Sequence, residues 1–122
     1  MYSPQLLDHF QRPRNAGELA NPDAQVRVEN PACGDILELS ANVREGKIVE
    51  IRFKAKGCVP AMACGSLITE LAKGKSLNEA AAVSREEVNE QVGGLPAASG
   101  HAAVLAVDAL RTLVRRLRNR EK

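Results

Sequence analysis

The middle of the chain shows the alternation of apolar and polar residues that is typical of strands half buried in a sheet. This alternation predicts three strands, at residues 25–30, 35–44 and 47–56. Only Glu45 and Gly46 separate the last two strands, and such a dipeptide favours a tight hairpin turn. We therefore expect three antiparallel strands in one sheet.

Apolar residues recur at helical spacing on both sides of these strands. The spacing predicts one helix before the strands and four after them, at residues 4–11, 60–73, 76–82, 84–92 and 101–119. Ser76 and Ser84 are each followed three residues later by a glutamate, which is the capping-box pattern. Strands followed by helices indicate an α+β domain, with a three-stranded antiparallel sheet, helices packed on one face and a long C-terminal helix.

The composition is that of an ordinary folded domain. Apolar residues make up 44% of the 122 residues and charged residues 26%, but aromatic residues only 2%, so the core must be built from aliphatic side chains. The chain shows no internal repeat, low-complexity tract or interdomain linker. We therefore expect one domain over residues 1–122.

Charge and hydropathy argue against two classes of partner. A net charge of +2 is too small for a nucleic-acid surface, which concentrates many basic groups on one face. A solvated helix end explains the basic cluster in the last predicted helix better than a docking patch for an acidic protein does. This cluster consists of Arg111, Arg115, Arg116, Arg118 and Arg120.

Residues 1–10 lack the apolar run of a signal peptide, and no stretch approaches the roughly 20 apolar residues of a membrane span. The sequence thus predicts a cytoplasmic protein with no nucleic-acid or membrane partner.

The three cysteines are an odd number, which in a reducing compartment favours ligands, nucleophiles or core thiols over a disulfide framework. Cys33 and Cys58 fall on predicted loops carried by the sheet, where reactive groups commonly lie. Gly34 lets the chain turn so that Cys33 and Asp35 can point at one place. Cys58 precedes a predicted helix, whose dipole favours a thiolate. Each residue taken alone also fits a structural role, as a small buried thiol or a turn-forming aspartate.

The remaining candidates are two histidines and a third cysteine. His101 opens the last predicted helix, where an isolated histidine is more often exposed or capping than a ligand. His9 has no cysteine near it in sequence and is predicted to lie on the surface. Cys64 shares a helical stripe with Ile68 and Leu71, so we expect its thiol to face the core, with a spare-ligand role as the alternative. Two thiolates, one carboxylate and one imidazole suit zinc or cluster iron, but their scattered spacing does not by itself define a site.

Several short strings occur in an order and spacing that resemble the IscU/NifU-type scaffold family. They run from about residue 2 to 118, and they are Tyr2-Ser3, Asp8-His9, Pro13-Arg14-Asn15, Pro31-Ala32-Cys33-Gly34-Asp35, Arg52-Phe53-Lys54, Gly57-Cys58 and Lys73-Gly74-Lys75-Ser76-Leu77. The two cysteine strings are the hallmark of that family. The resemblance implies a NifU N-terminal-like fold and a scaffold or carrier for a 2Fe-2S cluster, which is not an enzyme.

The resemblance also implies a ligand set and partners. It assigns Cys33, Asp35, Cys58 and His101 to binding a transient 2Fe-2S cluster, iron or zinc. A cysteine desulfurase would pass sulfane sulfur to a scaffold thiolate, iron would join, and the cluster would move to acceptor apo iron-sulfur proteins. Oxygen ligation by Asp35 would make the cluster easier to release, because a carboxylate is a harder partner for iron than a thiolate.

Two departures from the family pattern bear on function. The family's third ligand cysteine should stand at residue 102, where this chain has Ala102. Either Cys64 substitutes, or the four remaining groups hold the metal, or cluster assembly has been lost. The segment that a dedicated chaperone reads in the family is replaced here by residues 95–99, which argues against chaperone recruitment. Two alternatives stay open: a zinc-bound sulfur acceptor working with a desulfurase, and a metal-free remnant that only binds a partner.

Overall fold

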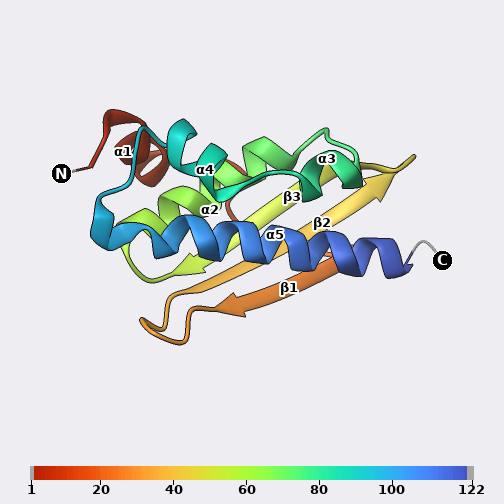
Figure 1. Ribbon diagram of the computed structural model, residues 1–122. Coiled ribbons are helices and arrows are strands. Elements are labelled where there is room, and N and C mark those ends of the chain that lie inside the picture. The colour runs from red at the N-terminus through yellow and green to blue at the C-terminus, as the bar shows by residue number, and fades with distance from the viewer. Residues whose placement is uncertain (1, 121–122) are drawn as a thin grey trace.

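The computed structural model describes residues 2–120, and the expected elements follow one another in the expected order (Figure 1). Their bounds are α1 Pro4–Gln11, β1 Ala24–Glu29, β2 Ile36–Arg44, β3 Lys47–Lys56, α2 Val59–Ala72, α3 Leu77–Ala81, α4 Arg85–Gln91, η1 Ala97–Ser99 and α5 His101–Arg120. The prediction of an α+β fold is confirmed. The 3-10 turn η1, just before α5, is an element that the sequence pattern did not predict.

The sheet has the order β1-β2-β3, and both neighbouring pairs are antiparallel. Glu45 and Gly46 join β2 to β3 with φ angles of 56° and 77°, the conformation expected of a two-residue hairpin turn. Glu29 lies opposite Ile36, and Ile36 lies opposite Lys56. The segments that follow β1, precede β2 and follow β3 therefore leave the sheet at the same end.

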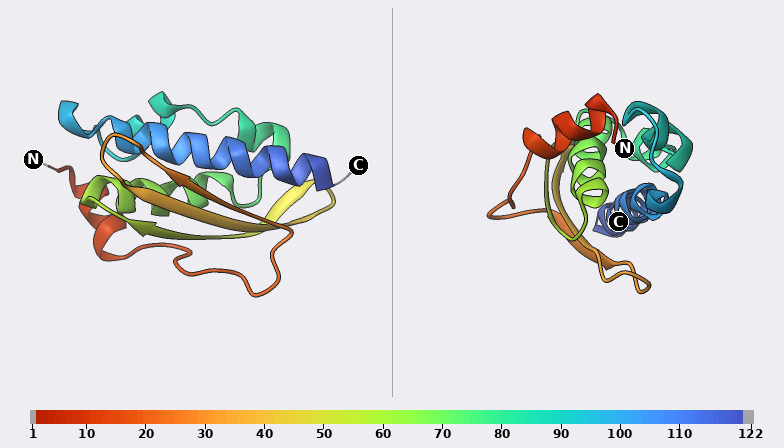
Figure 2. Two further views of the ribbon diagram at one scale, coloured as in Figure 1. Left: turned by 90° about the horizontal axis from the view of Figure 1, so that it is seen from below. Right: turned by 90° about the vertical axis from the view of Figure 1, so that its left-hand side faces the viewer.

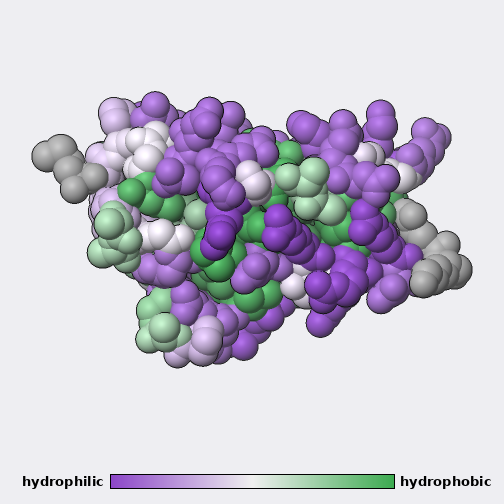
Figure 3. Space-filling view, viewed as in Figure 1, coloured by the Kyte–Doolittle hydropathy of each residue, from purple (hydrophilic) through white to green (hydrophobic). Residues whose placement is uncertain are grey.

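Helices α2 to α5 lie on one side of the sheet (Figure 2). Helix α2 packs against β3, α5 crosses β1 and β2, α1 contacts α2, and α3 and α4 lie against α5. Buried aliphatic side chains fill the space between these layers, as the low aromatic content predicts. Hydrophilic residues cover most of the helical face, with apolar residues showing between them (Figure 3).

Helix α2 approaches the sheet closely at Gly65. A Cβ atom at this position would lie 2.9 Å from Cδ2 of Phe53 and 3.0 Å from Cδ1 of Leu37. Real Cβ contacts are almost never this short, so the missing side chain is what allows this helix-to-sheet distance.

Helix α5 is more apolar than expected. Together with η1 it is long and apolar enough to cross a membrane by length and composition, whereas the sequence pattern predicted no such stretch. In the structure 50% of this apolar window is buried inside the protein. Leu105, Leu110 and Leu113 are among its buried residues, and α5 contacts both β1 and β2. The apolar side of α5 thus serves the core of the fold.

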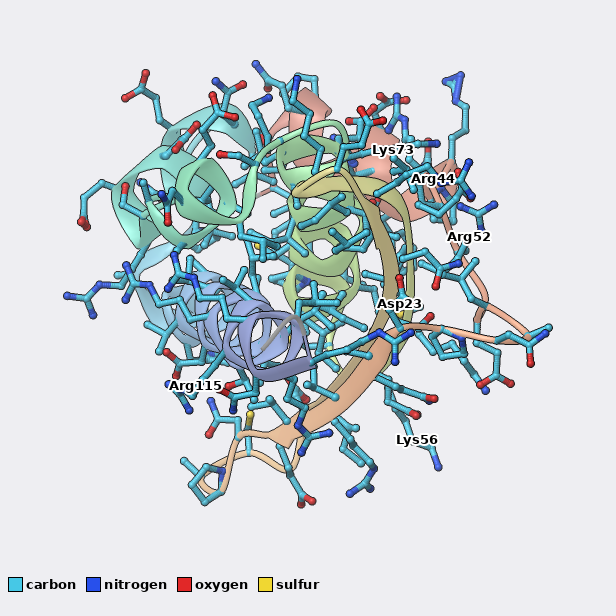
Figure 4. All side chains as sticks on the ribbon, turned by 90° about the vertical axis from the view of Figure 1, so that its right-hand side faces the viewer. Asp23, Arg44, Arg52, Lys56, Lys73 and Arg115 are labelled. Carbon is cyan, nitrogen blue, oxygen red and sulfur yellow. The ribbon has the colours of Figure 1, made fainter. Side chains whose placement is uncertain are left out.

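Two arginines at the C-terminal end of α5 bond to residues at the start of β1. Arg116 Nη1 donates a hydrogen bond to the carbonyl of Gln25, and Arg120 Nη2 lies 3.0 Å from Asp23 Oδ1. Arg115 is exposed and points outward (Figure 4). The arginine cluster therefore combines solvated side chains with others that hold the helix end against the sheet.

His9 is buried, so the prediction that it lies on the surface is wrong. The residue is only 7% exposed, with Nδ1 2.8 Å from Ser66 Oγ and Nε2 3.4 Å from Glu70 Oε1. Helix α1 packs against α2 through Leu6 and His9, which lie one turn apart on the same helix face. Burial, which is the largest effect, and the nearby charge of Arg14 lower the pKa of His9, so the buried ring is neutral.

This burial predicts a pH-dependent loss of stability. In the unfolded chain His9 becomes protonated as the pH falls below its ordinary pKa of 6.5. In the folded protein the imidazole becomes protonated only at a lower pH, near its lowered pKa. The free energy of unfolding should therefore fall as the pH decreases from 6.5, and His9→Gln should remove this part of the dependence. Denaturant titrations of both proteins at several pH values measure the two slopes, and equal slopes would contradict the assignment.

Candidate metal centre

The predicted site residues meet at the end of the sheet where the β1–β2 loop and the C-terminus of β3 lie. Cys33 belongs to that loop, Asp35 directly precedes β2, Cys58 is the N-cap of α2, and His101 is the first residue of α5. In Figure 1 this end is on the left, where α5 begins beside the loop. Three separate chain segments thus bring the four side chains to one place.

Two of the other side chains approach one carboxylate oxygen of Asp35, and Cys33 lies close by. The Cys58 thiol donates a hydrogen bond of 3.0 Å to Asp35 Oδ2, and His101 Nε2 lies 3.5 Å from the same oxygen. Cys58 Sγ and His101 Nε2 are 3.8 Å apart. Cys33, Asp35 and His101 each offer one ligand atom, and these atoms all lie within 4.8 Å of one another. Such a set of sulfur, oxygen and nitrogen donors can hold a metal ion.

The donors differ in their access to solvent. Asp35 is buried at 6% exposure, Cys58 and His101 are half-buried, and Cys33 is exposed. A buried carboxylate with an exposed thiol beside it makes a shallow site, open on the side of Cys33. The Cys33 thiol is thus accessible from solvent.

The protonation states of Asp35 and Cys58 depend on each other. Hydrogen bonding from Cys58, the largest effect, together with that from Cys33 and the charge of His101, lowers the pKa of Asp35. Burial first, and then the Asp35 carboxylate, raise the pKa of the Cys58 thiol. The expectation that the helix start favours a Cys58 thiolate is therefore wrong for the metal-free protein. The backbone of Ala61 at the helix start does lower this pKa, but burial and a neighbouring negative charge outweigh it.

Gly57 provides the space that Asp35 occupies. It adopts a φ of +147°, and a Cβ atom there would lie 2.2 Å from Oδ1 and 2.5 Å from Cγ of Asp35. No other residue type leaves this volume empty, so Gly57 positions the carboxylate. The sequence marks Gly57 only as the neighbour of a cysteine, and its role depends on Asp35, which is distant along the chain.

Cys64 and Ala102 lie in the core. Cys64 is fully buried in α2, and burial raises the pKa of its thiol to about 12. Ala102, at 1% exposure, packs among the apolar residues of the core. The expectation of a core-facing Cys64 agrees with this arrangement, which brings Cys33, Asp35, Cys58 and His101 together without it.

Comparison with known proteins relates the chain to a family of scaffold proteins. The model of the NifU-like N terminal domain matches residues 1–122. The chain is 43% identical over 114 residues to the iron-sulfur cluster assembly scaffold protein IscU 1 of Archaeoglobus fulgidus, covering 93% of this chain and 74% of that protein. It is 42% identical over 117 residues to the protein named IscU of Escherichia coli, covering 93% and 91%.

Solved structures show the same fold. The crystal structure of a nitrogen-fixing NifU-like protein (N-terminal) from Brucella abortus matches with a TM-score of 0.81 at 17% identity, covering 96% of this chain and 94% of that chain. A putative iron-sulfur cluster assembly scaffold protein for the SUF system from Fervidobacterium islandicum matches with a TM-score of 0.78 at 18% identity, covering 93% and 96%. At such low identity these matches establish the fold alone.

Substituting Gly57 should disturb the donor set more than it disturbs the fold. Gly57→Ala places a methyl group on the Asp35 carboxylate, so we expect about tenfold weaker binding of Co²⁺, a spectroscopic probe for thiolate sites. Gly17→Ala is the matched control, because Gly17 also has a positive φ, +121°, but no atom within 4 Å of an added Cβ. Both variants should lose about 1–2 kcal/mol of stability through backbone strain. Equal Co²⁺ affinities in the two variants would rule out the positioning role.

Proposed function

The chain belongs to the NifU-like N-terminal domain family, and on that premise we propose that it is a scaffold for iron-sulfur cluster assembly and transfer. The observation that carries this proposal is the convergence of two thiols and one imidazole on the buried carboxylate of Asp35. A scaffold needs donors that hold a cluster and surroundings that let it leave. The half-open site at the end of the sheet meets both needs.

We assign Cys33, Asp35, Cys58 and His101 as the ligands of a transient 2Fe-2S cluster, which is the cargo of the scaffold. A 2Fe-2S cluster takes four protein ligands, and thiolates are its usual ones, with histidine replacing cysteine in some centres. This chain offers two thiolates, one imidazole and one carboxylate around one point. Ala102 offers no donor and Cys64 lies in the core, so the four remaining groups supply the complete set.

The residues of the site bind the cluster, and one of them must lose its thiol proton in order to do so. In the metal-free protein the Cys58 proton is held by hydrogen bonding to Asp35, and this proton must leave when the thiolate becomes a ligand. Exposed Cys33 is the thiol that a sulfur-donating partner reaches first. The protein supplies a cradle rather than catalysis, and it is not an enzyme in this proposal.

The proposal implies two classes of partner. A cysteine desulfurase transfers sulfane sulfur to a scaffold thiolate, which becomes a persulfide, and two electrons from a cellular reductant convert that sulfur to the sulfide of the cluster. Acceptor apo iron-sulfur proteins then receive the cluster. Residues 95–99, which lead through η1 into α5, differ from the chaperone-binding pattern of the family, so chaperone recruitment is not part of the proposal. A reducing cytoplasm would keep both site thiols available as ligands.

A zinc-bound sulfur acceptor is the second candidate function. The number of donors at the site, four, is the coordination number of a tetrahedral zinc ion. This match favours zinc as an alternative resident metal. In that case zinc would hold the thiols, and the Cys58 thiolate would take the outer sulfur of the desulfurase persulfide, which would leave the desulfurase cysteine as a thiolate. Elemental analysis of protein purified without oxygen separates the two functions. Stoichiometric zinc together with accelerated desulfurase turnover favours the acceptor, and the absence of any metal favours a partner-binding remnant.

Anaerobic reconstitution with iron and sulfide tests the scaffold function. We expect the visible absorption of a 2Fe-2S cluster in the parent protein and its loss in Cys33→Ala and in Cys58→Ala, because each variant lacks one of only two thiolate ligands at the site. Cys64→Ala is the matched control and should keep the absorption, since Cys64 is a core thiol. A colourless parent protein, or loss of colour only in the Cys64 variant, would refute the assigned ligand set.

Asp35 should make the cluster easier to release. A carboxylate is a harder and poorer ligand for cluster iron than a thiolate, so Asp35→Ala should slow transfer to an acceptor severalfold. Transfer kinetics to an apo ferredoxin, followed by circular dichroism, measure this effect in the reconstituted proteins. Faster release from Asp35→Ala than from the parent would show that the carboxylate retains the cluster instead.

A further inference from the structure

The two edges of the sheet differ in how fully their backbone groups are bonded. At the β3 edge, Phe53 exchanges hydrogen bonds with residues 15–17, and Ile48 does so with residues 74–75. These segments cover β3 along much of its length. Strand β1, at the other edge, has no such covering segment among residues 2–120. A free strand edge can pair with another strand.

The ladder pattern shows which groups of β1 point toward the open edge. The Asn30 N–H donates to the carbonyl of Asp35 at 2.8 Å. In an alternating antiparallel ladder, the backbone N–H and C=O groups of the even-numbered residues of β1 therefore point toward β2. The N–H and C=O groups of Gln25, Arg27 and Glu29 therefore point outward. This is a set of backbone donors and acceptors with strand spacing.

Helix α5 covers only the first part of the open edge. Arg116 donates to the carbonyl of Gln25, and Arg120 pairs with Asp23 at 3.0 Å, both near the start of β1. The stretch from Arg27 to Glu29 lies beyond these arginines. Its outward backbone groups have no hydrogen-bond partner within the part of the chain that the structure describes.

We propose that β1 pairs with the same strand of a second copy of this chain, in antiparallel orientation, about a two-fold axis at Val28. Arg27 then lies opposite the partner's Glu29, and Glu29 lies opposite the partner's Arg27. Residues that face each other in this way exchange both backbone hydrogen bonds. Each pair also sets a cation against a carboxylate, a favourable cross-strand combination.

Charge selects this register over its neighbours. An axis at Arg27 would place two arginines opposite each other, and an axis at Glu29 would do the same with two carboxylates. Charged side chains on an edge usually oppose pairing with other strands. Here Arg27 and Glu29 alternate on the outer face, with Nη1 of Arg27 4.0 Å from Oε1 of Glu29, and this alternation is complementary to its own inverted copy.

The arginine that bonds to the open edge of β1, Arg116, does not oppose this pairing. Arg116 bonds at Gln25, which lies three residues from Val28, or about 10 Å along the strand. The two-fold axis therefore keeps the Arg116 side chains of the two copies about 20 Å apart, beyond the screening length at physiological salt. At the axis, half-buried Val28 lies opposite the partner's Val28, so apolar surface on the helix side is covered.

Sedimentation of the metal-free protein over a range of concentrations tests this pairing, which goes beyond the proposed function and needs no cluster. The parent protein should form a dimer at high concentration. Arg27→Glu and Glu29→Arg should each weaken dimer formation by about tenfold or more, because each puts like charges opposite each other twice. The double variant Arg27→Glu/Glu29→Arg should restore the dimer, and a mixture of the two single variants should form heterodimers.

The control Arg85→Glu changes the net charge equally on α4, away from this edge, and should leave the dimer intact. Circular dichroism of each variant confirms that it is folded. A parent protein that stays monomeric at every concentration would leave this edge to a strand of another protein or to solvent, and would overturn the proposal. A dimer that Arg27→Glu and Glu29→Arg leave unchanged would overturn it as well.

Cross-linking tests the position of the axis independently of charge. In a Cys33→Ser/Cys58→Ser background, Val28→Cys should form an intermolecular disulfide under mild oxidation with diamide, because non-hydrogen-bonded partners have Cα atoms about 4.5 Å apart. Val49→Cys, at an exposed position on β3, is the control and should stay largely monomeric. Equal cross-linking at both positions would place the contact elsewhere.

Discussion

The buried carboxylate of Asp35 is the constraint on which the site depends. A charged oxygen at 6% exposure costs free energy unless neighbouring groups bond to it, and here a thiol and an imidazole do so. The donors are therefore arranged around Asp35 before any metal binds. Gly57 is part of the same arrangement, because only an absent side chain leaves room for the carboxylate. The site thus combines preorganised donor groups with a thiol proton that is hydrogen-bonded to the carboxylate.

The sheet brings these donors together through its register. Because the strands are antiparallel, the end of β1, the start of β2 and the end of β3 all lie at the same end of the sheet. Helix α5 runs back across β1 and β2, so its first residue, His101, comes to that same end. The arginines in the last turns of α5 hold its other end against the start of β1. The loops that carry the thiols are short, and they extend from a framework fixed on both sides.

The strand pattern and the helix spacing predict most of the fold, because both depend on local burial. Alternation over residues 35–44 and 47–56 and the Glu45-Gly46 turn predict the hairpin that the structure contains. The surface position predicted for His9 fails because sequence distance from a cysteine says nothing about which face of α1 packs against α2. The sequence pattern predicts no span-length apolar stretch in α5, whereas the structure has one, since the arginines of this helix are concentrated at one end.

Residue chemistry by itself identified the types of side chain that can bind a metal, because thiols, carboxylates and imidazoles are recognisable without coordinates, and the family resemblance singled out four of them. It also determined that Ala102 cannot, since alanine has no donor atom. Only the tertiary structure decided that residues 33, 35, 58 and 101 share one place, because strand register and helix packing set distances between residues remote in sequence. It likewise decided that the pKa of the Cys58 thiol is raised rather than lowered. The helix start acts locally, whereas burial and the charge of Asp35 come from the folded chain and outweigh it.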